Sequence, residues 1–290
     1  MIEADLLGVG VWGSPFSNWA DFSTGIRTGQ WQEDSELKPA LLPPNVARRA
    51  PRSVKMAVEV MQQACLMASV SPQDLAVTFS SMMGDSHITD QMCRTLASEP
   101  RLLSPTQFHN SVHNAPVGYW SIATGAHAPV NAMAAFEHSA PVALLEAAIQ
   151  VVEENTMVLL VTQEVEMPKA LGSVCASRSP FSSALVLARP GAHATPLATL
   201  KLVVGRGATP WPPLPEGLRA RLSGNPGAAL VPVLAALATQ LEPSGAETDS
   251  ERPGSEVNFL FPLSEHRHLS LTVIPSTAGS PEPKALNRTS

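Results

Sequence analysis

The chain has 290 residues, of which 44% are apolar and 15% charged, so it can bury a sizeable core and is not intrinsically disordered. Its formal charge of −6 gives it no general attraction to nucleic acid or to an anionic membrane, and no apolar run is long enough to span a bilayer. Three widely spaced cysteines argue against a disulfide framework or a structural zinc site, and we expect a cytoplasmic protein without a signal peptide.

The first two-thirds of the sequence predicts strands that alternate with helices. Apolar runs bounded by turns predict buried strands, and apolar residues at helical spacing predict helices. In chain order we expect a strand at 6–10, an irregular stretch to about 51, a helix at 53–68 capped by Ser53, a strand at 75–79, a helix at 86–97, a helix at 111–124 interrupted near Pro116, a strand at 129–135, a helix at 139–152 capped by Ser139, and strands at 157–162 and 183–188. This β-α-β-α-(α)-β-α-β-β order predicts an α/β fold with helices on both faces of a mixed sheet.

After about residue 190 the sequence becomes rich in proline and glycine. Proline reaches 27 residues in the whole chain, roughly twice its usual share of about 5%. We expect a strand at 200–204, a loop at 205–227, a helix at 230–241, a polar loop at 242–257, and strands at 259–261 and 269–274. The sequence thus predicts an α/β domain at 1–190, a short α+β extension at 191–275 that packs on it, and a disordered tail at 276–290.

Residues 8–13 read GVGVWG, a literal GxGxxG after a strand. A dinucleotide site needs a helix N-terminus directly after this loop, so that the helix faces the pyrophosphate. The segment SPFSN follows instead, and we interpret the motif as a glycine-rich strand end.

Gly84, Asp85 and Ser86 lie between a predicted strand and a predicted helix, like the nucleophile block of GDSL-type hydrolases. That chemistry needs a histidine base, usually in a late D-x-x-H, and no aspartate here has a histidine at that spacing. We interpret the segment as a helix cap and keep a serine hydrolase at Ser86 as a third hypothesis.

His109 and His113 are four residues apart and would share one face of a helix. Two imidazoles at this spacing can hold a metal ion, but a site needs a third ligand and groups that orient the rings. Neither is visible, so we predict no metal site and interpret the two histidines as a polar pair near a loop or an interface.

Residues 108–125 read FHNSVHNAPVGYWSIATG. This segment resembles the N-x-x-x-G-x-x-x-I-x-x-G pattern of β-ketoacyl synthases through Asn114, Gly118, Ile122 and Gly125. The elements that follow, including the strand at 157–162 with Glu164 just after it, also resemble the N-terminal half of the thiolase-like fold over roughly 1–190. The segment LSEHRHL at 263–269 is similar to the ending of small synthase-like proteins from aryl-polyene-type gene clusters.

In this family the catalytic cysteine lies between a strand and a helix N-terminus, which lowers the pKa of the thiol and stabilises the oxyanion. The resemblance, carried over without gaps, places Glu137 at the nucleophile position and Ser139 just after it. No cysteine lies within thirty residues of Glu137, and the residues at 134–136 are not nucleophiles either. The paired histidines of the family's C-terminal half are also missing, and we interpret His266 and His268 as exposed polar residues.

These absences resemble those of chain-length factors. The resemblance implies a non-catalytic subunit that uses no cofactor and pairs with a Cys-bearing ketosynthase in polyketide or fatty-acid-type (aryl polyene-like) biosynthesis. Carrier proteins of this family are acidic and dock on basic patches. This chain has a net charge of −6 and only one basic cluster, Arg48, Arg49, Arg52 and Lys55, so an acyl carrier protein would take part only indirectly. The pocket and interface residues that the resemblance implies are His109, His113, Asn114, Gly118, Tyr119, Trp120, Phe136 and Ser139. The enzymatic alternative is an acyltransferase or decarboxylase in which Glu137 acts as an acid or base.

Overall fold

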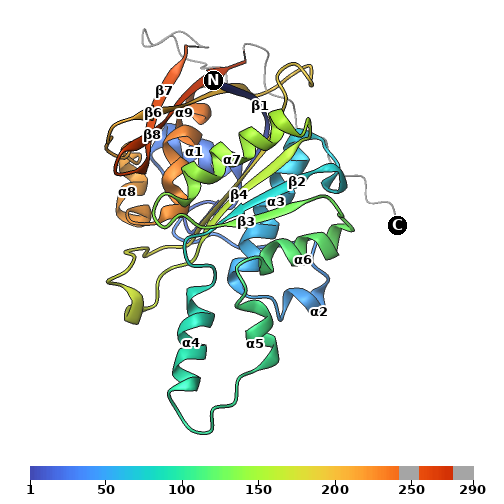
Figure 1. Cartoon of the computed structure of the whole chain (residues 1–290), viewed down its shortest axis with the longest axis vertical. Helices are drawn as coiled ribbons and strands as arrows, with labels where there is room; N and C mark the ends of the chain where they lie inside the picture. Colours follow the sequence, from blue (N-terminus) through green and yellow to red (C-terminus); the bar gives the residue numbers. More distant parts are fainter. Residues whose placement is uncertain (242–254, 277–290) are drawn as a thin grey trace.

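A computed structural model describes residues 1–241 and 255–276 of the chain (Figure 1). In this part of the chain one eight-stranded sheet has the order β3-β2-β4-β5-β1-β6-β8-β7. The strands are β1 (Ile2–Gly13), β2 (Ala76–Ser80), β3 (Val130–Met133), β4 (Val158–Glu164), β5 (Phe181–Ala188), β6 (Ala198–Arg206), β7 (Val257–Ser264) and β8 (Arg267–Pro275). The sheet is mixed, because β2 runs parallel to β3 and β4 while the other neighbouring strands pair antiparallel.

Helices cover both faces of this sheet. They are α1 (Trp19–Thr28), α2 (Pro44–Ala47), α3 (Arg52–Ala68), α4 (Ser86–Leu96), α5 (Pro105–Asn110), α6 (Ala115–Thr124), α7 (Ser139–Glu153), α8 (Glu216–Leu222) and α9 (Val231–Gln240). Buried apolar residues of α3 and α6 form one core with one sheet face, and those of α7 and α9 form a second core with the other face. The predicted α/β fold with helices on both faces is therefore confirmed.

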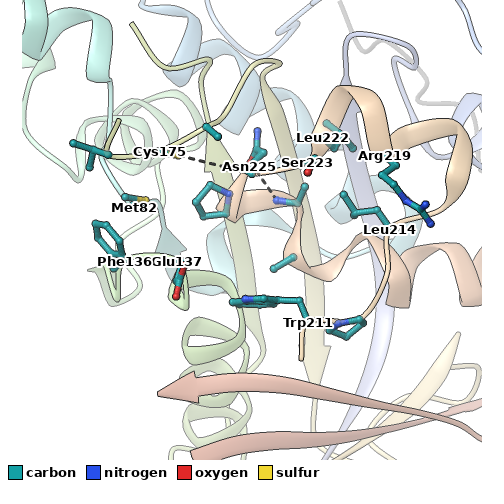
Figure 2. Close-up of a pocket in the computed structure, with 17 residues that line it drawn as sticks. Met82, Phe136, Glu137, Cys175, Trp211, Leu214, Arg219, Leu222, Ser223 and Asn225 are labelled. Carbon is teal, nitrogen blue, oxygen red and sulfur yellow. Dashed lines mark hydrogen bonds between the residues drawn. The ribbon is translucent and has the colours of Figure 1, made fainter. Parts of the chain in front are cut away.

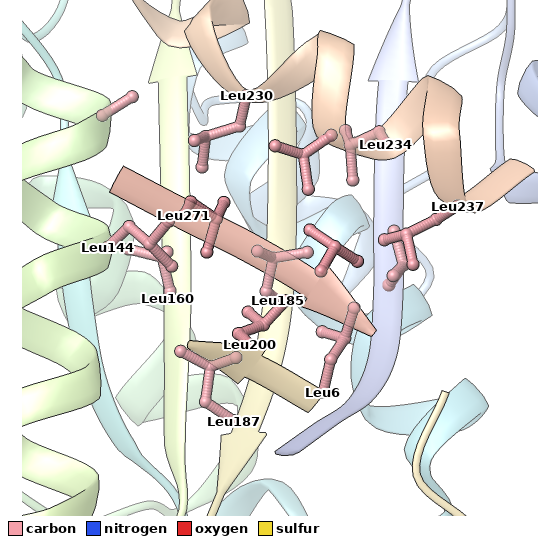
Figure 3. Close-up of a cluster of buried hydrophobic side chains, with 14 of the residues drawn as sticks. Leu6, Leu144, Leu160, Leu185, Leu187, Leu200, Leu230, Leu234, Leu237 and Leu271 are labelled. Carbon is pink, nitrogen blue, oxygen red and sulfur yellow. The ribbon is translucent and has the colours of Figure 1, made fainter. Parts of the chain in front are cut away.

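The end of the sheet that contains β6 and β8 crosses over the rest of it. Figure 3 shows β6 and β8 lying across the direction of β1, β5 and β4, with leucine side chains such as Leu6, Leu185 and Leu271 between them. These side chains are nearly inaccessible to solvent. Because each fully buried leucine stabilises a fold by roughly 2 kcal/mol, this layer is a large part of the core. The strands after residue 190 thus belong to the same sheet. The division of the chain into a domain at 1–190 and an extension at 191–275 stays a prediction.

The GxGxxG motif serves helix packing. Gly8 and Gly10 lie in β1 under α3, where a Cβ atom on Gly10 would overlap the main-chain oxygen of Val60 and one on Gly8 would overlap that of Ala64. A helix backbone can approach a strand this closely only where the strand has no side chain. The prediction that the motif is a glycine-rich strand end agrees with this geometry.

Four helices, α1, α2, α5 and α8, were not predicted from the sequence. α1 falls in the stretch expected to be irregular, although Asn18 caps its first turn and Gly29 ends it in the left-handed conformation. α8 falls in the loop expected at 205–227 and starts directly after Pro215. Prolines precede α8, and both α1 and α8 are short helices whose apolar faces are completed only by packing.

Two predicted helix caps were wrong. α3 starts at Arg52, and the Ser53 hydroxyl instead donates a hydrogen bond to the Asp85 carboxylate at 2.7 Å. α7 starts at Ser139 itself, so this residue lies inside the first turn rather than before it. The helix expected at 111–124 is also shorter, because the break lies before Ala115, and Pro116 occupies the first turn of α6, where its missing N–H is tolerated.

The structure does not describe residues 242–254 and 277–290, so most of the expected loop at 242–257 and the expected disordered tail lie outside the described residues. Among the residues that are described, no helix is long and apolar enough to cross a membrane. Figure 1 also shows α4 and α5 extending from the body as a helical hairpin, which we call the arm (residues 86–110).

Candidate functional site at the turn between β3 and α7

A tight turn joins β3 to α7 at residues 134–138. Phe136 has a φ angle of 53°, which non-glycine residues rarely adopt. The Ser139 hydroxyl holds the turn, because it accepts from the Ala135 N–H at 2.9 Å and donates to the Phe136 carbonyl at 2.5 Å. A strained residue between a strand and a helix is the geometry that lifts a catalytic side chain above a sheet in nucleophile elbows. Here that residue is a phenylalanine whose side chain is exposed.

Glu137, the residue that the resemblance assigns to the nucleophile position, follows Phe136 directly. Its carboxylate is largely exposed and lies 3.6 Å from the imidazole of His138. The His138 ring stacks on Trp211, with 5.6 Å between ring centroids and 14° between planes. Glu137 therefore belongs to a small group of charged and aromatic side chains at the start of α7.

A cleft of about 510 Å³ opens beside this turn (Figure 2). Its walls come from the turn, from the loop around Cys175, from the proline-rich segment before α8, and from α8 and the residues after it. The lining residues are Met82, Phe136, Glu137, Val174, Cys175, Ala176, Trp211, Pro212, Leu214, Arg219, Leu222, Ser223, Gly224, Asn225, Pro226, Ala228 and Ala229. A mainly apolar cleft of this size with a few polar groups is typical of small-molecule sites.

None of the three cysteines lies in the turn itself. Cys65 lies on the buried side of α3, and burial raises the pKa of its thiol to about 12. Cys175 lines the cleft, but its thiol donates a hydrogen bond to the Gly224 carbonyl, and burial raises its pKa as well. Cys93 is exposed on α4 and is absent from the cleft lining. Because the thiolate is the reactive form, a raised pKa makes a thiol a poor nucleophile.

Glu164 is a buried carboxyl at the end of β4, next to the cleft. It accepts a hydrogen bond from the main-chain N–H of Met82, and the Ser81 hydroxyl and the Met83 N–H also favour its charged form. Burial outweighs these bonds and raises the pKa of Glu164 to about 8. The carboxyl thus fixes the loop between β2 and α4, which is the base of the arm.

Glu164 should make the stability of the protein depend on pH. Its pKa is raised above the unfolded value of 4.5, so the folded state holds a proton that the unfolded state releases between about pH 4.5 and 8. The free energy of unfolding should therefore fall across this range, by on the order of 5 kcal/mol from this group. In Glu164→Gln the fall should be clearly smaller, measured by denaturant unfolding between pH 5 and 8.5. The exposed Glu153→Gln is the control, and equal pH dependence in all three proteins would contradict the assignment.

The structure separates the two histidines considered as a metal pair. α5 ends at Asn110, so His109 and His113 do not share one helix face. His109 is exposed near the Tyr119 ring, whereas Nε2 of His113 donates to the Ser81 carbonyl at 2.6 Å and burial lowers the pKa of that imidazole. Across residues 1–241 and 255–276, no group of three or more His, Cys, Asp or Glu side chains is arranged to hold a metal ion.

The residues of the ketosynthase-like motif divide between the core and the surface. Trp120 is fully buried against α3, and the Tyr119 hydroxyl donates to the Asn110 side chain at 3.1 Å. Asn114 and Gly118 are exposed, at the start and in the middle of α6. Ile122, the isoleucine of the motif, is the most exposed large apolar residue of α6, at 86%.

Ser86 is not arranged as a hydrolase nucleophile. Its side chain is fully buried, and its hydroxyl lies 3.5 Å from the main-chain oxygen of Glu166 rather than beside a histidine base. Asp85 caps α4 by accepting from the Ile88 N–H. This agrees with the helix-cap interpretation.

At one end of the sheet, β3 lies with both faces uncovered. Val130, Asn131 and Ala132 are all exposed although alternate residues point to opposite faces. Its main chain pairs with β2 alone among the described strands. Strands at an edge are usually protected by charges, proline or a bulge within the strand, and the sequence VNAM of β3 contains none of these.

Comparison with known proteins identifies the family. The sequence profile described as Beta-ketoacyl synthase, N-terminal domain, matches residues 18–206, which is more than half of the chain. The chain belongs to the β-ketoacyl synthase family. No curated protein matches it in sequence.

Solved structures of this family share its fold. A chain from the complex of the ketosynthase ApeO with its chain length factor ApeC, from Xenorhabdus doucetiae, matches with a TM-score of 0.66 and 20% identity over 94% of this chain and 100% of that chain. A chain of the ishigamide ketosynthase/chain length factor matches with a TM-score of 0.72 and 14% identity over 95% and 99%. A β-ketoacyl synthase from Burkholderia phymatum matches with a TM-score of 0.66 and 13% identity over 95% and 100%. The predicted thiolase-like ketosynthase fold is therefore confirmed.

Proposed function

We propose that this chain is a non-catalytic, chain-length-factor-like subunit of a β-ketoacyl synthase. The observation that carries this proposal is the turn between β3 and α7, where Phe136 holds the strained position and no thiol is present. Condensation by this family needs a cysteine nucleophile at that turn. Cys175 lines the neighbouring cleft, but its raised pKa makes it a poor substitute.

The partner in this proposal is a Cys-bearing ketosynthase, and the pathway is polyketide or fatty-acid-type synthesis, such as that of aryl polyenes. Two of the solved structures that resemble the chain come from ketosynthase–chain length factor pairs, and another contains a type II acyl carrier protein with its ketosynthase. These assemblies are properties of the other proteins, and they support a paired rather than a solitary role for this one.

The uncovered edge strand β3 and helix α6 supply a pairing surface. β3 offers a free row of main-chain donors and acceptors to a strand of a second protein. Ile122 of α6, at 86% exposure, and Val130 of β3 add apolar area on the two elements that the short segment 125–129 connects. The arm carries further exposed apolar residues, Leu102 and Phe108. Exposed apolar residues gathered on adjoining elements mark protein–protein contact surfaces.

Co-expression with a Cys-bearing ketosynthase tests the proposal. The two chains should co-purify, and the pair should condense malonyl units on an acyl carrier protein, whereas this chain alone should show no condensation. Replacing the nucleophilic cysteine of the ketosynthase should abolish the activity of the pair. Condensation by this chain alone would refute the proposal.

The same assay distinguishes the non-catalytic proposal from the enzymatic alternative. Glu137 lines the cleft at the N-terminal end of α7 and could take part in acyl transfer or decarboxylation. If the chain is non-catalytic, Glu137→Ala should change the condensation rate of the pair by less than about twofold. A loss of more than about tenfold, with the pair still assembled, would assign a chemical role to this carboxylate.

A further inference from the structure

The cleft beside the turn gathers large apolar residues that the fold leaves exposed. Phe136, Val174 and Trp211 are 55%, 44% and 38% exposed, and all three line it. They come from three separate segments of the chain. Apolar side chains that are exposed singly are ordinary, but a set that lines one concavity indicates that an apolar molecule occupies it.

One cation stands at the far end of this cleft. Figure 2 shows Arg219 of α8 at the opposite end from Phe136 and Glu137, with Trp211 and Leu214 between them. The guanidinium is exposed, and within residues 1–241 and 255–276 it makes no ion pair or hydrogen bond. Arg219 also borders a second hollow, which shares Trp211 and Leu214 with the cleft and continues along the proline-rich segment. An unpaired guanidinium at the junction of two apolar hollows is suited to a carboxylate, which it can bind with two parallel hydrogen bonds.

Glu137 gives the end of the cleft opposite Arg219 a negative charge. Its carboxylate lies at the end that Phe136 lines, and it would repel an anion placed there. An elongated ligand with one anionic end is therefore favoured in a single orientation, with its charge at Arg219 and its apolar end towards Phe136.

We propose that this cleft binds an unbranched aliphatic carboxylate without a covalent bond. The carboxylate pairs with Arg219, and the chain lies over Trp211 and Leu214 towards Phe136. Both the charge pair and the apolar contacts are needed, because a guanidinium at the surface binds a carboxylate only weakly by itself. The site belongs to this chain alone and does not depend on a ketosynthase partner, so its absence would leave the proposed pairing function untouched.

Calorimetric titration of the full chain with decanoate, below its micellar concentration, tests this site. Saturable binding with one decanoate per chain is expected. Arg219→Gln should weaken decanoate binding at least about tenfold, because it removes the charge-assisted hydrogen bonds. Arg221→Gln is the matched control, since Arg221 lies on the same helix but lines neither hollow, and it should bind decanoate like the wild type.

Two further measurements distinguish the contribution of the charge pair to binding from that of the apolar contacts. Decanamide, which lacks the charge, should bind more weakly than decanoate and equally to wild type and Arg219→Gln. Trp211→Ala should weaken the binding of both ligands. No saturable decanoate binding, or equal effects of Arg219→Gln and Arg221→Gln, would overturn the proposal.

Discussion

Replacing Ile122 by aspartate is expected to abolish pairing with a ketosynthase while leaving the chain folded. Ile122 is 86% exposed, so the substitution removes little buried area from the isolated chain. If α6 and β3 form the pairing surface, the aspartate would bury an unpaired charge in the complex, which costs several kcal/mol. The affinity should fall by at least about 100-fold, measured by co-purification and by titration of the two purified chains.

A matched control is available on the same sheet. Val203 is 44% exposed on β6. In the sheet, β2, β4, β5 and β1 lie between β3 and β6, so Val203 is far from β3. Val203→Asp introduces the same charge at an exposed apolar position and should leave pairing intact. Thermal unfolding of both variants checks that they fold. Normal co-purification of Ile122→Asp would show that the partner binds elsewhere on the chain.

Replacing Gly10 by alanine should destabilise the protein by about 3 kcal/mol or more, although the change adds one methyl group. The new Cβ would overlap the main chain of α3 at Val60, and neither a helix backbone nor a central strand can move aside cheaply. The measurement is the free energy of unfolding in denaturant.

Gly118→Ala is the control for this change. Gly118 lies in α6 with open space where a Cβ would stand, so alanine should leave stability unchanged or raise it by up to about 1 kcal/mol through helix propensity. If Gly10→Ala and Gly118→Ala unfolded at the same denaturant concentration, the close approach of α3 to β1 would not be what the glycine provides.

The central strands could be predicted because they are buried on both faces. β2, β4 and β5 read as short apolar runs between turn residues, and burial is the cause of that pattern. α1 and α8 were not predicted because each is short and is stabilised by the elements that it packs on, and α8 also follows several prolines. The caps assigned to Ser53 and Ser139 were wrong because a hydroxyl can satisfy other donors and acceptors once the chain is folded.

The candidate site was predictable in part. A single motif located the turn before α7 and the lack of a cysteine there, since both follow from local sequence order. The same motif could not say which face of α6 is free. Packing against α3 buries Trp120 and leaves Ile122 in solvent, and only the fold decides this.

The cleft itself had no signature in the sequence. Trp211 and Arg219 come from a segment more than seventy residues after Phe136, in a region that reads as a loop, and no local spacing connects them. The buried Glu164 was visible as an acid after a strand, but its raised pKa depends on the main chain that closes over it.

The position of β1 has a consequence for how the protein is made. β1 is completed by Gly13, but its two neighbours in the sheet, β5 and β6, end at Ala188 and Arg206. At typical synthesis rates of about 5–20 residues per second, β1 waits on the order of ten seconds for a partner strand. An apolar strand left single for that time is open to pairing with other chains. Because β1 joins β5 to β6, the two parts of the sheet cannot be connected until both of these strands have been synthesised, and β1 is open to such pairing until then.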